Sequence, residues 1–186
     1  MRFSWESIAV RIKCLLVDLV IGIKNWNMDP SFRIIQVQQD AVQHSDFVGR
    51  GKWVCWSLPG RVLKLNIDGF CLSGFMRGGG VVWDPKGEVV LAFAAFYGKG
   101  SSIKAEAKAL WSGISICEQR GLNINIIETD SKVILDCLQG NISSTWDISD
   151  IIRRARSKLE NKGIHVNHTW REGNMVVKYF ASMEET

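Results

Sequence analysis

The chain has 186 residues, of which 46% are hydrophobic and 23% charged. These proportions are typical of a globular protein with a folded core, and they exclude a disordered chain. The formal net charge of +4 permits nucleic-acid binding without indicating it. The five cysteines form no C-x-x-C pair, which argues against a zinc site. Their odd number is typical of reduced thiols in an intracellular protein, nuclear or cytoplasmic.

The N-terminal part is expected to differ from the rest of the chain. Residues 1–52 are predicted to form an extension, made of a helix and a linker, ahead of a main domain at 53–186. The apolar segment 8–23 contains charged residues, and its uninterrupted apolar runs are too short to span a bilayer. It lacks the cleavage pattern of a signal peptide, although its basic start leaves that alternative open. An amphipathic or buried helix without membrane association is favoured.

Three apolar stretches that follow residue 60 predict strands. The first covers residues 62–68, and the second and third cover 78–83 and 88–96. A turn with the sequence Asp-Pro-Lys-Gly, at residues 84–87, separates the second stretch from the third. The three stretches therefore predict an antiparallel meander.

A long helix is predicted over residues 101–121, because apolar residues recur there at helical spacing, a serine can cap its start and Gly121 ends it. The remaining predicted elements are a strand at 123–130, helices at 131–140 and 145–163, a strand at 164–170 and a helix at 174–185. Helices that connect strands imply parallel pairing. The expected fold is α/β, with a five-stranded mixed sheet in which strands 1–3 are antiparallel and strands 4 and 5 parallel, and with helices on both faces.

Three acidic residues stand out by their positions in these elements. Asp68 ends the first predicted strand, Asp130 ends the fourth, and Glu106 lies near the start of the long helix. If the first and fourth strands are parallel neighbours, Asp68 and Asp130 meet at one edge of the sheet, where the helix can bring Glu106. Gathered carboxylates repel one another unless a cation binds or some stay protonated. Two Mg²⁺ or Mn²⁺ ions about 3.5–4 Å apart would suit phosphodiester hydrolysis.

Each acid also has an ordinary structural interpretation. Asp68 can begin a turn with the glycine that follows it, and Glu106 can be an exposed residue near a helix N-terminus. Asp130 can open the next helix. The ordinary interpretation is favoured for each acid taken alone, whereas the three acids in this order favour a site.

Five ordered segments of the chain resemble the type 1 ribonuclease H family. They read KLNIDG (64–69), GGGVVWDPKG (78–87), KAEAKAL (104–110), ETDS (128–131) and HTWREGN (168–174). The similarity covers roughly residues 53–182 and is greatest to the divergent branch common in plants and linked to retrotransposon-type reverse transcriptases. The resemblance implies the ribonuclease H-like fold, cleavage of the RNA strand of RNA–DNA hybrids with two Mg²⁺ ions, and no small-molecule cofactor.

The resemblance also implies roles for individual residues. By position, Asp68, Glu106 and Asp130 match the family's first three metal ligands. His168 matches a mobile histidine that assists product release, and Asn174 matches the asparagine that opens the last helix.

The chain departs from the family at Lys178, which stands where the family has a fourth carboxylate. A protonated lysine cannot coordinate a metal ion. It can neutralise the three acids so that the metal is lost, or it can stabilise phosphate charge where a second ion would lie. The turn after the first strand also lacks the family's Asn-Pro-Gly and is shorter, which affects a segment that grips the RNA strand in the family.

Other residues offer weaker indications. Trp83, Trp111 and Trp170 are expected in the core, although an exposed tryptophan could stack on a base. Arg171 could reach a phosphate. The basic residues within 153–162 most simply make a solvated helix face, with phosphate contact as the less favoured interpretation.

Three functions therefore remain open. The first is a metal-dependent endoribonuclease that acts on RNA–DNA hybrids. The second is a catalytically degenerate nucleic-acid-binding module, and the third is a mobile-element remnant with neither activity. Nucleic acid, as RNA–DNA hybrid or RNA, is the expected partner of a monomeric protein in the first two cases.

Overall fold

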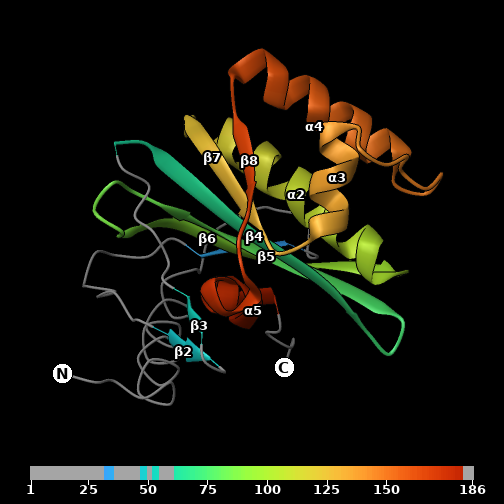
Figure 1. Cartoon of the computed structure of the whole chain (residues 1–186), viewed down its shortest axis with the longest axis horizontal. Helices are drawn as coiled ribbons and strands as arrows, with labels where there is room; N and C mark the ends of the chain where they lie inside the picture. The colour runs from blue at the N-terminus through green and yellow to red at the C-terminus, as the bar shows by residue number, and fades with distance from the viewer. Residues whose placement is uncertain (1–31, 36–46, 50–51, 55–60, 182–186) are drawn as a thin grey trace.

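The computed structural model describes residues 32–35, 47–49, 52–54 and 61–181. The main sheet contains β1 (Phe32–Ile35), β4 (Leu63–Leu72), β5 (Phe75–Trp83), β6 (Val89–Lys99), β7 (Ile124–Thr129) and β8 (His165–His168). The strand order across it is β1-β6-β5-β4-β7-β8 (Figure 1). A separate antiparallel pair is formed by β2 (Phe47–Gly49) and β3 (Lys52–Val54). The helix expected within residues 8–23 lies outside the described residues.

The five strands expected after residue 60 are present, and they pair as the sequence predicts. Strands β4, β5 and β6 form the antiparallel meander, β7 is parallel to β4, and β8 is parallel to β7. A further strand, β1, comes from the stretch expected to be a linker and pairs antiparallel with β6. The sequence pattern does not show this strand because four residues are too few to establish a period. The domain boundary at residue 53 stays a prediction.

The first strand of the meander is longer than expected. It does not end at Asp68, because its antiparallel ladder with β5 continues to the pair Leu72–Phe75. The chain then reverses through Ser73 and Gly74, whose φ angles are 52° and 81°. The parallel ladder with β7, in contrast, stops at the pair Ile67–Thr129. Asp68 therefore follows the last parallel pair without ending its own strand.

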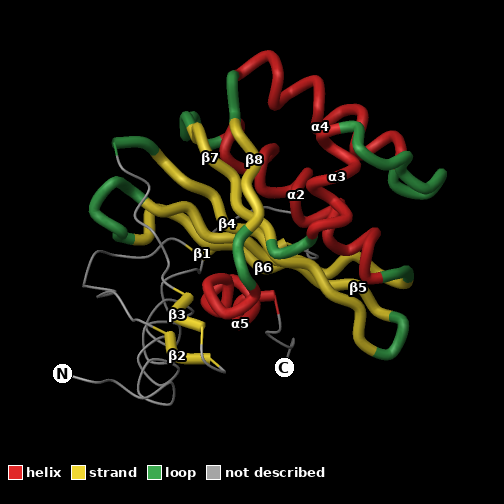
Figure 2. Tube along the Cα trace, in the orientation of Figure 1, coloured by secondary structure: helices red, strands yellow, loops and turns green. Residues whose placement is uncertain are grey.

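Helices cover both faces of the sheet, as Figures 1 and 2 show. One face carries α2 (Ser102–Gln119), α3 (Lys132–Gln139) and α4 (Ser149–Lys162). The opposite face carries α5 (Met175–Ala181), which follows the 3-10 helix η1 (Arg171–Asn174). None of the described helices has the length and apolar character needed to cross a membrane.

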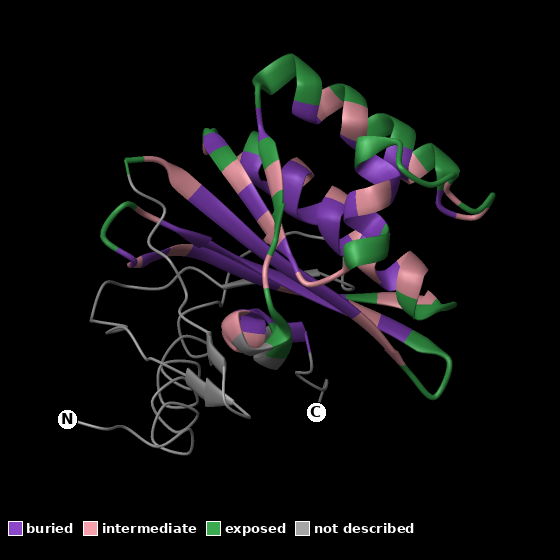
Figure 3. Ribbon diagram, in the orientation of Figure 1, coloured by how far each residue is buried: buried purple, intermediate pink, exposed green. Residues whose placement is uncertain are grey.

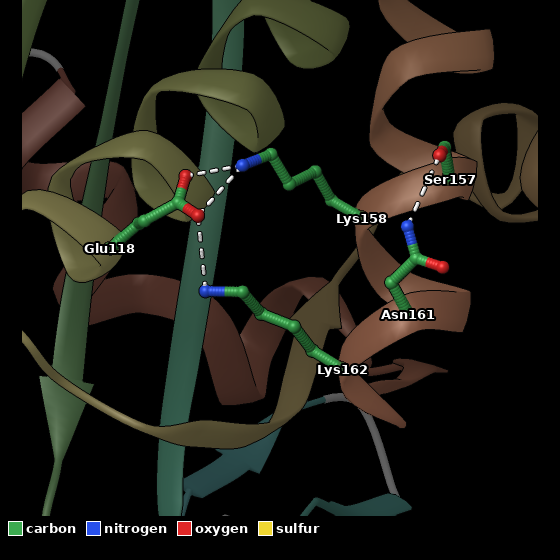
Figure 4. A network of polar contacts seen from close by, with 5 residues as sticks. All are labelled: Glu118, Ser157, Lys158, Asn161 and Lys162. Atoms are coloured by element: carbon green, nitrogen blue, oxygen red, sulfur yellow. Dashed lines mark hydrogen bonds and ion pairs between the residues drawn. The ribbon is translucent and has the colours of Figure 1, made fainter.

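The core lies between the sheet and α2, where buried residues are concentrated (Figure 3). It includes Leu65, Ile67, Phe93, Leu110 and Ile114, all with less than 3% of their surface exposed. At the periphery, α4 is joined to α2 by Lys158 and Lys162, which both pair with Glu118 (Figure 4). Burial of the apolar residues provides most of the packing energy, since exposed ion pairs contribute little.

Candidate metal centre

The central strand β4 carries polar side chains at every second position. Lys64, Asn66 and Asp68 share one face of the sheet because side chains alternate along a strand. All three are buried, with exposed fractions of 1%, 1% and 5%. Buried polar groups need partners, so this face of β4 marks a polar site inside an otherwise apolar sheet.

Gly69, the residue after Asp68, lets α2 approach the strand. A Cβ atom on Gly69 would lie 2.4 Å from the carbonyl carbon of Ala105 and 2.4 Å from the amide nitrogen of Glu106. The Gly69 amide also donates a hydrogen bond to Glu106 Oε2 at 3.1 Å. Ser101 caps α2 by accepting a bond from the Lys104 amide, which fixes where the helix begins. These contacts place Glu106 beside the strand that carries Asp68.

The structure brings the three predicted acids together. Asp68, Glu106 and Asp130 each offer a carboxylate oxygen, and these three oxygens lie within 4.8 Å of one another. Asp68 comes from β4, Glu106 from α2, and Asp130 from the end of the neighbouring parallel strand β7. We call these three residues the carboxylate cluster.

The cluster holds protons more tightly than isolated acids do. Burial, and then the charge of Asp130, raises the pKa of Asp68 to about 7, although Lys178, Arg171 and a bond from the Gly69 amide act in the opposite direction. Burial, and then the charges of Asp68 and Asp130, raises the pKa of Glu106 to about 9. A bound cation would favour the ionised form of both groups.

The donor set fits a divalent metal ion. All three ligands are hard carboxylate oxygens, which suit Mg²⁺ or Mn²⁺. Asp130 Oδ1 is buried and has no hydrogen-bond partner among the described residues. A buried carboxylate oxygen without a partner is unfavourable, and an ion coordinated by the cluster would satisfy it.

Two cationic side chains act on the same acids. Arg171 Nε lies 3.3 Å from Asp130 Oδ2; the arginine side chain is 72% exposed, whereas that of Asp130 is 6% exposed. Lys178 lies on α5 and is exposed, and its charge lowers the pKa of Asp68. The family resemblance seen in the sequence draws attention to Lys178 at the position of the fourth carboxylate. The pairing of Arg171 with Asp130, in contrast, is seen only in the structure.

His168 lies at the end of β8, opposite Thr129, the residue before Asp130. It is exposed, and its ring contacts Trp170 edge to face, with ring centroids 5.7 Å apart. Trp170 is 58% exposed, so the expectation that it lies in the core is wrong: it precedes η1 at the end of the edge strand. Trp83 is buried as expected, and Trp111 is partly buried beneath the Arg154 guanidinium.

Asn174 fastens the start of α5 to the central strand. Its side-chain amide donates to the Ile67 carbonyl at 2.8 Å, and its Oδ1 accepts from Asn66 at 3.2 Å. Asn66 also donates to Glu128, which forms an ion pair of 3.1 Å with the buried Lys64. Asn174 thus has a positioning role, since it holds the segment between Arg171 and Lys178 against the strand that carries Asp68. The alternation of polar residues in KLNID is the signal by which sequence reasoning could have found this network.

The fold is similar to those of solved ribonucleases H. Ribonuclease H1 of the archaeon Halobacterium salinarum matches with a TM-score of 0.55 and 19% identity, over 64% of this chain and 93% of that chain. LC11 ribonuclease H1, solved in complex with an RNA/DNA hybrid, matches with a TM-score of 0.58 and 17% identity, over 63% and 92% of the two chains.

A larger protein contains a similar unit. The prototype foamy virus protease–reverse transcriptase matches with a TM-score of 0.55 and 15% identity, over 68% of this chain but 21% of the viral chain. No curated protein sequence matches this chain. The family model described as "Reverse transcriptase-like" matches residues 66–184, more than half of the chain and all three acids of the cluster. The chain therefore belongs to the reverse transcriptase-like family, and it has the ribonuclease H fold.

Proposed function

We propose that this protein is a metal-dependent nuclease of the ribonuclease H type, which hydrolyses the RNA strand of RNA–DNA hybrids. The carboxylate cluster carries the proposal, because the buried Asp68 and two partly buried acids converge from three separate elements, and Asp130 Oδ1 has no hydrogen-bond partner among the described residues. Asp68, Glu106 and Asp130 would hold Mg²⁺ or Mn²⁺. The bound metal would supply a polarised phosphate and an activated water.

The surrounding residues would prepare the site for this reaction. The Gly69 amide orients the Glu106 carboxylate through its hydrogen bond, so that the acid faces the cluster with little freedom. Asn174 holds α5 on β4 through the Ile67 carbonyl. His168 is exposed beside the strand that leads to Asp130, where it can exchange protons with water and with a departing strand end.

Nucleic acid is the proposed partner. Two proteins of similar fold, LC11 ribonuclease H1 and the foamy viral protease–reverse transcriptase, were solved in complex with RNA/DNA hybrids. The exposed Arg171 and Lys178 provide positive charge beside the cluster, which complements a phosphate backbone. We propose a monomer that acts inside the cell, away from membranes, and that derives from the plant retrotransposon-related branch which its motifs resemble.

One observation favours a second candidate, a nucleic-acid-binding module that no longer cleaves. Lys178 places a cation near Asp68 where a fourth carboxylate is expected, and Arg171 already neutralises one oxygen of Asp130. If these two cations replace the metal altogether, the protein would bind hybrids with a strong dependence on salt but would not hydrolyse them.

Cleavage of a labelled RNA–DNA hybrid, in Mg²⁺ and then in Mn²⁺, tests the proposal. The wild type would be compared with Asp68→Asn, Lys178→Asp and the double variant, and duplex RNA and duplex DNA would serve as control substrates. Hybrid-specific cleavage that Asp68→Asn abolishes is the expected result. Cleavage seen only in Lys178→Asp, and lost again in the double variant, would instead mean that the wild-type site is silenced at Lys178, and would favour the binding module. A lack of cleavage by all four proteins would overturn the proposed reaction.

A further inference from the structure

The two oxygens of Asp130 have different surroundings. Oδ2 faces the Arg171 guanidinium, with 3.3 Å between Nε and Oδ2. Oδ1 is buried and has no hydrogen-bond partner among the described residues. A carboxylate can contact two metal ions through its two oxygens, but here an arginine already takes one of them. Asp130 is thus arranged to serve one metal ion and one side-chain cation.

A second side-chain cation approaches the cluster from another element. Lys178 comes from α5, whereas Arg171 begins η1, and the charges of both residues lower the pKa of Asp68. The Asn174 bond to the Ile67 carbonyl fixes the backbone between them, so their placement follows from the fold. The carboxylate cluster therefore has one cation in contact with it, Arg171 on Asp130, and a second, Lys178 on α5, whose charge acts on Asp68.

The charges around the cluster favour a single divalent ion. When all three acids are ionised, Arg171 and Lys178 leave one net negative charge among these five side chains. One divalent ion changes this to one net positive charge, and the single negative charge of a phosphodiester then makes the site neutral. A second divalent ion would leave two positive charges uncompensated in a partly buried site, which is unfavourable.

We propose that the site binds one divalent metal ion, and that Arg171, supported by Lys178, takes the place of a second. The Arg171 side chain is 72% exposed although that of Asp130 is 6% exposed, so water and phosphate reach the guanidinium and it can leave Asp130 when a phosphate arrives. A guanidinium offers two parallel N–H donors that match phosphate oxygens. The proposal rests on the proposed nuclease function and assigns Arg171 direct contact with the phosphate to be cleaved.

Counting bound Mn²⁺ ions tests the proposal without depending on activity. The purified chain would be titrated with Mn²⁺ at low ionic strength, with free Mn²⁺ measured by electron paramagnetic resonance. The proteins compared would be the wild type, Arg171→Gln, Arg171→Gln/Lys178→Gln and Asp68→Asn. Arg153→Gln is a matched control, because this exposed arginine pairs with Asp150 on α4, away from the cluster. Circular dichroism would show that each variant is folded.

We expect one ion per wild-type chain and two per chain of the double variant, which gains no new ligand. Arg171→Gln alone should bind the first ion about two- to five-fold more tightly, because the guanidinium no longer competes for Asp130. Arg153→Gln should match the wild type, and Asp68→Asn should lose most of the binding. Two ions in the wild type, or one in the double variant, would overturn the inference but leave the proposed nuclease intact.

Two further outcomes would distinguish the inference from the proposed function. Binding by the double variant but not by the wild type would show that the cations exclude metal altogether, which overturns the one-ion site and supports the binding module. No binding by either protein, although both are folded, would overturn both the inference and the metal-dependent nuclease.

Discussion

At the scale of single residues, the acids of the cluster are held in an environment that disfavours their charge. Asp68 is 5% exposed, and one of its carboxylate oxygens lies within 4.8 Å of carboxylate oxygens of Glu106 and Asp130. Its pKa rises from an ordinary value of 3.8 to about 7, and that of Glu106 rises from 4.5 to about 9. The folded chain therefore binds protons that the unfolded chain releases at lower pH. Without a cation, the cluster makes the fold less stable as the pH rises.

This difference in pKa between the folded and the unfolded chain predicts that stability falls as the pH rises and that metal ions oppose the fall. The contribution of Asp68 to the free energy of unfolding is fully present below about pH 4 and is lost as the pH rises through 7. The corresponding loss for Glu106 continues toward pH 9. We expect the Tm in EDTA to fall between pH 5 and pH 8.5, by about 2–4 °C for each kcal/mol lost. Mg²⁺ should restore much of the loss at the higher pH.

Asp68→Asn identifies the group responsible, because the neutral amide resembles the protonated acid. Thermal melts of this variant in EDTA should lose the part of the pH dependence that Asp68 contributes and keep the part that burial of Glu106 contributes, and Mg²⁺ should raise its Tm little. Glu160→Gln, which changes an exposed acid on α4, should follow the wild type and controls for loss of charge. Identical pH profiles for Asp68→Asn and the wild type would mean that Asp68 does not contribute to this pH dependence.

At the scale of elements, the site depends on the place where α2 crosses β4. Glu106 meets Asp68 only because the backbone of α2 lies against Gly69, where a Cβ atom would come within 2.4 Å of the Ala105 and Glu106 backbone. The dipeptide Asp68-Gly69 thus supplies a carboxylate and the space for its partner. The interpretation of this pair as an ordinary turn is wrong, since both residues lie inside β4.

Gly69→Ala should separate the two elements and open the cluster. Backbone atoms cannot move aside as a side chain can, so we expect a loss of at least about 1–3 kcal/mol in the free energy of unfolding. Weaker Mn²⁺ binding should accompany the loss. Gly100→Ala is the matched control, because its Cβ would meet the flexible end of the Met76 side chain at 2.4 Å, which can shift at smaller cost. Urea unfolding of the two variants would compare them, and equal losses would contradict the argument.

The sequence predicts the elements better than it predicts their contacts. The strands and helices after residue 60 are visible because apolar spacing records which side chains are buried, and Asp68 and Asp130 stand out because each ends a predicted strand. Arg171 and Asp130 lie 41 positions apart, and no local pattern links them. Lys64 is buried, which a lysine rarely is, and its ion pair with Glu128 compensates its charge. Partners of this kind depend on the register between strands, which one sequence does not specify.

At the scale of the whole molecule, the basic residues differ in how far neighbouring acids neutralise them. Half of the charge on four basic residues of α4 is compensated. Lys158 and Lys162 both pair with Glu118 (Figure 4). Arg153 and Arg154 both pair with Asp150. Each group of two cations and one acid adds only one net charge. Arg171, in contrast, pairs with an acid whose other neighbours are anionic, and it lies beside the proposed reaction centre.

Hybrid binding should therefore depend more on Arg171 than on α4. Each phosphate contact contributes a slope of about −0.9 to the dependence of log K on log salt for double-stranded DNA. In EDTA, where cleavage is absent, Arg171→Gln should reduce the slope measured with a labelled RNA–DNA hybrid by about 1. Lys158→Gln/Lys162→Gln should change it by less than that, although it removes twice the charge. If the α4 variant reduced the slope by about 2 and Arg171→Gln left it unchanged, the backbone would run along α4, and Arg171 would be a structural partner of Asp130 without a role in binding.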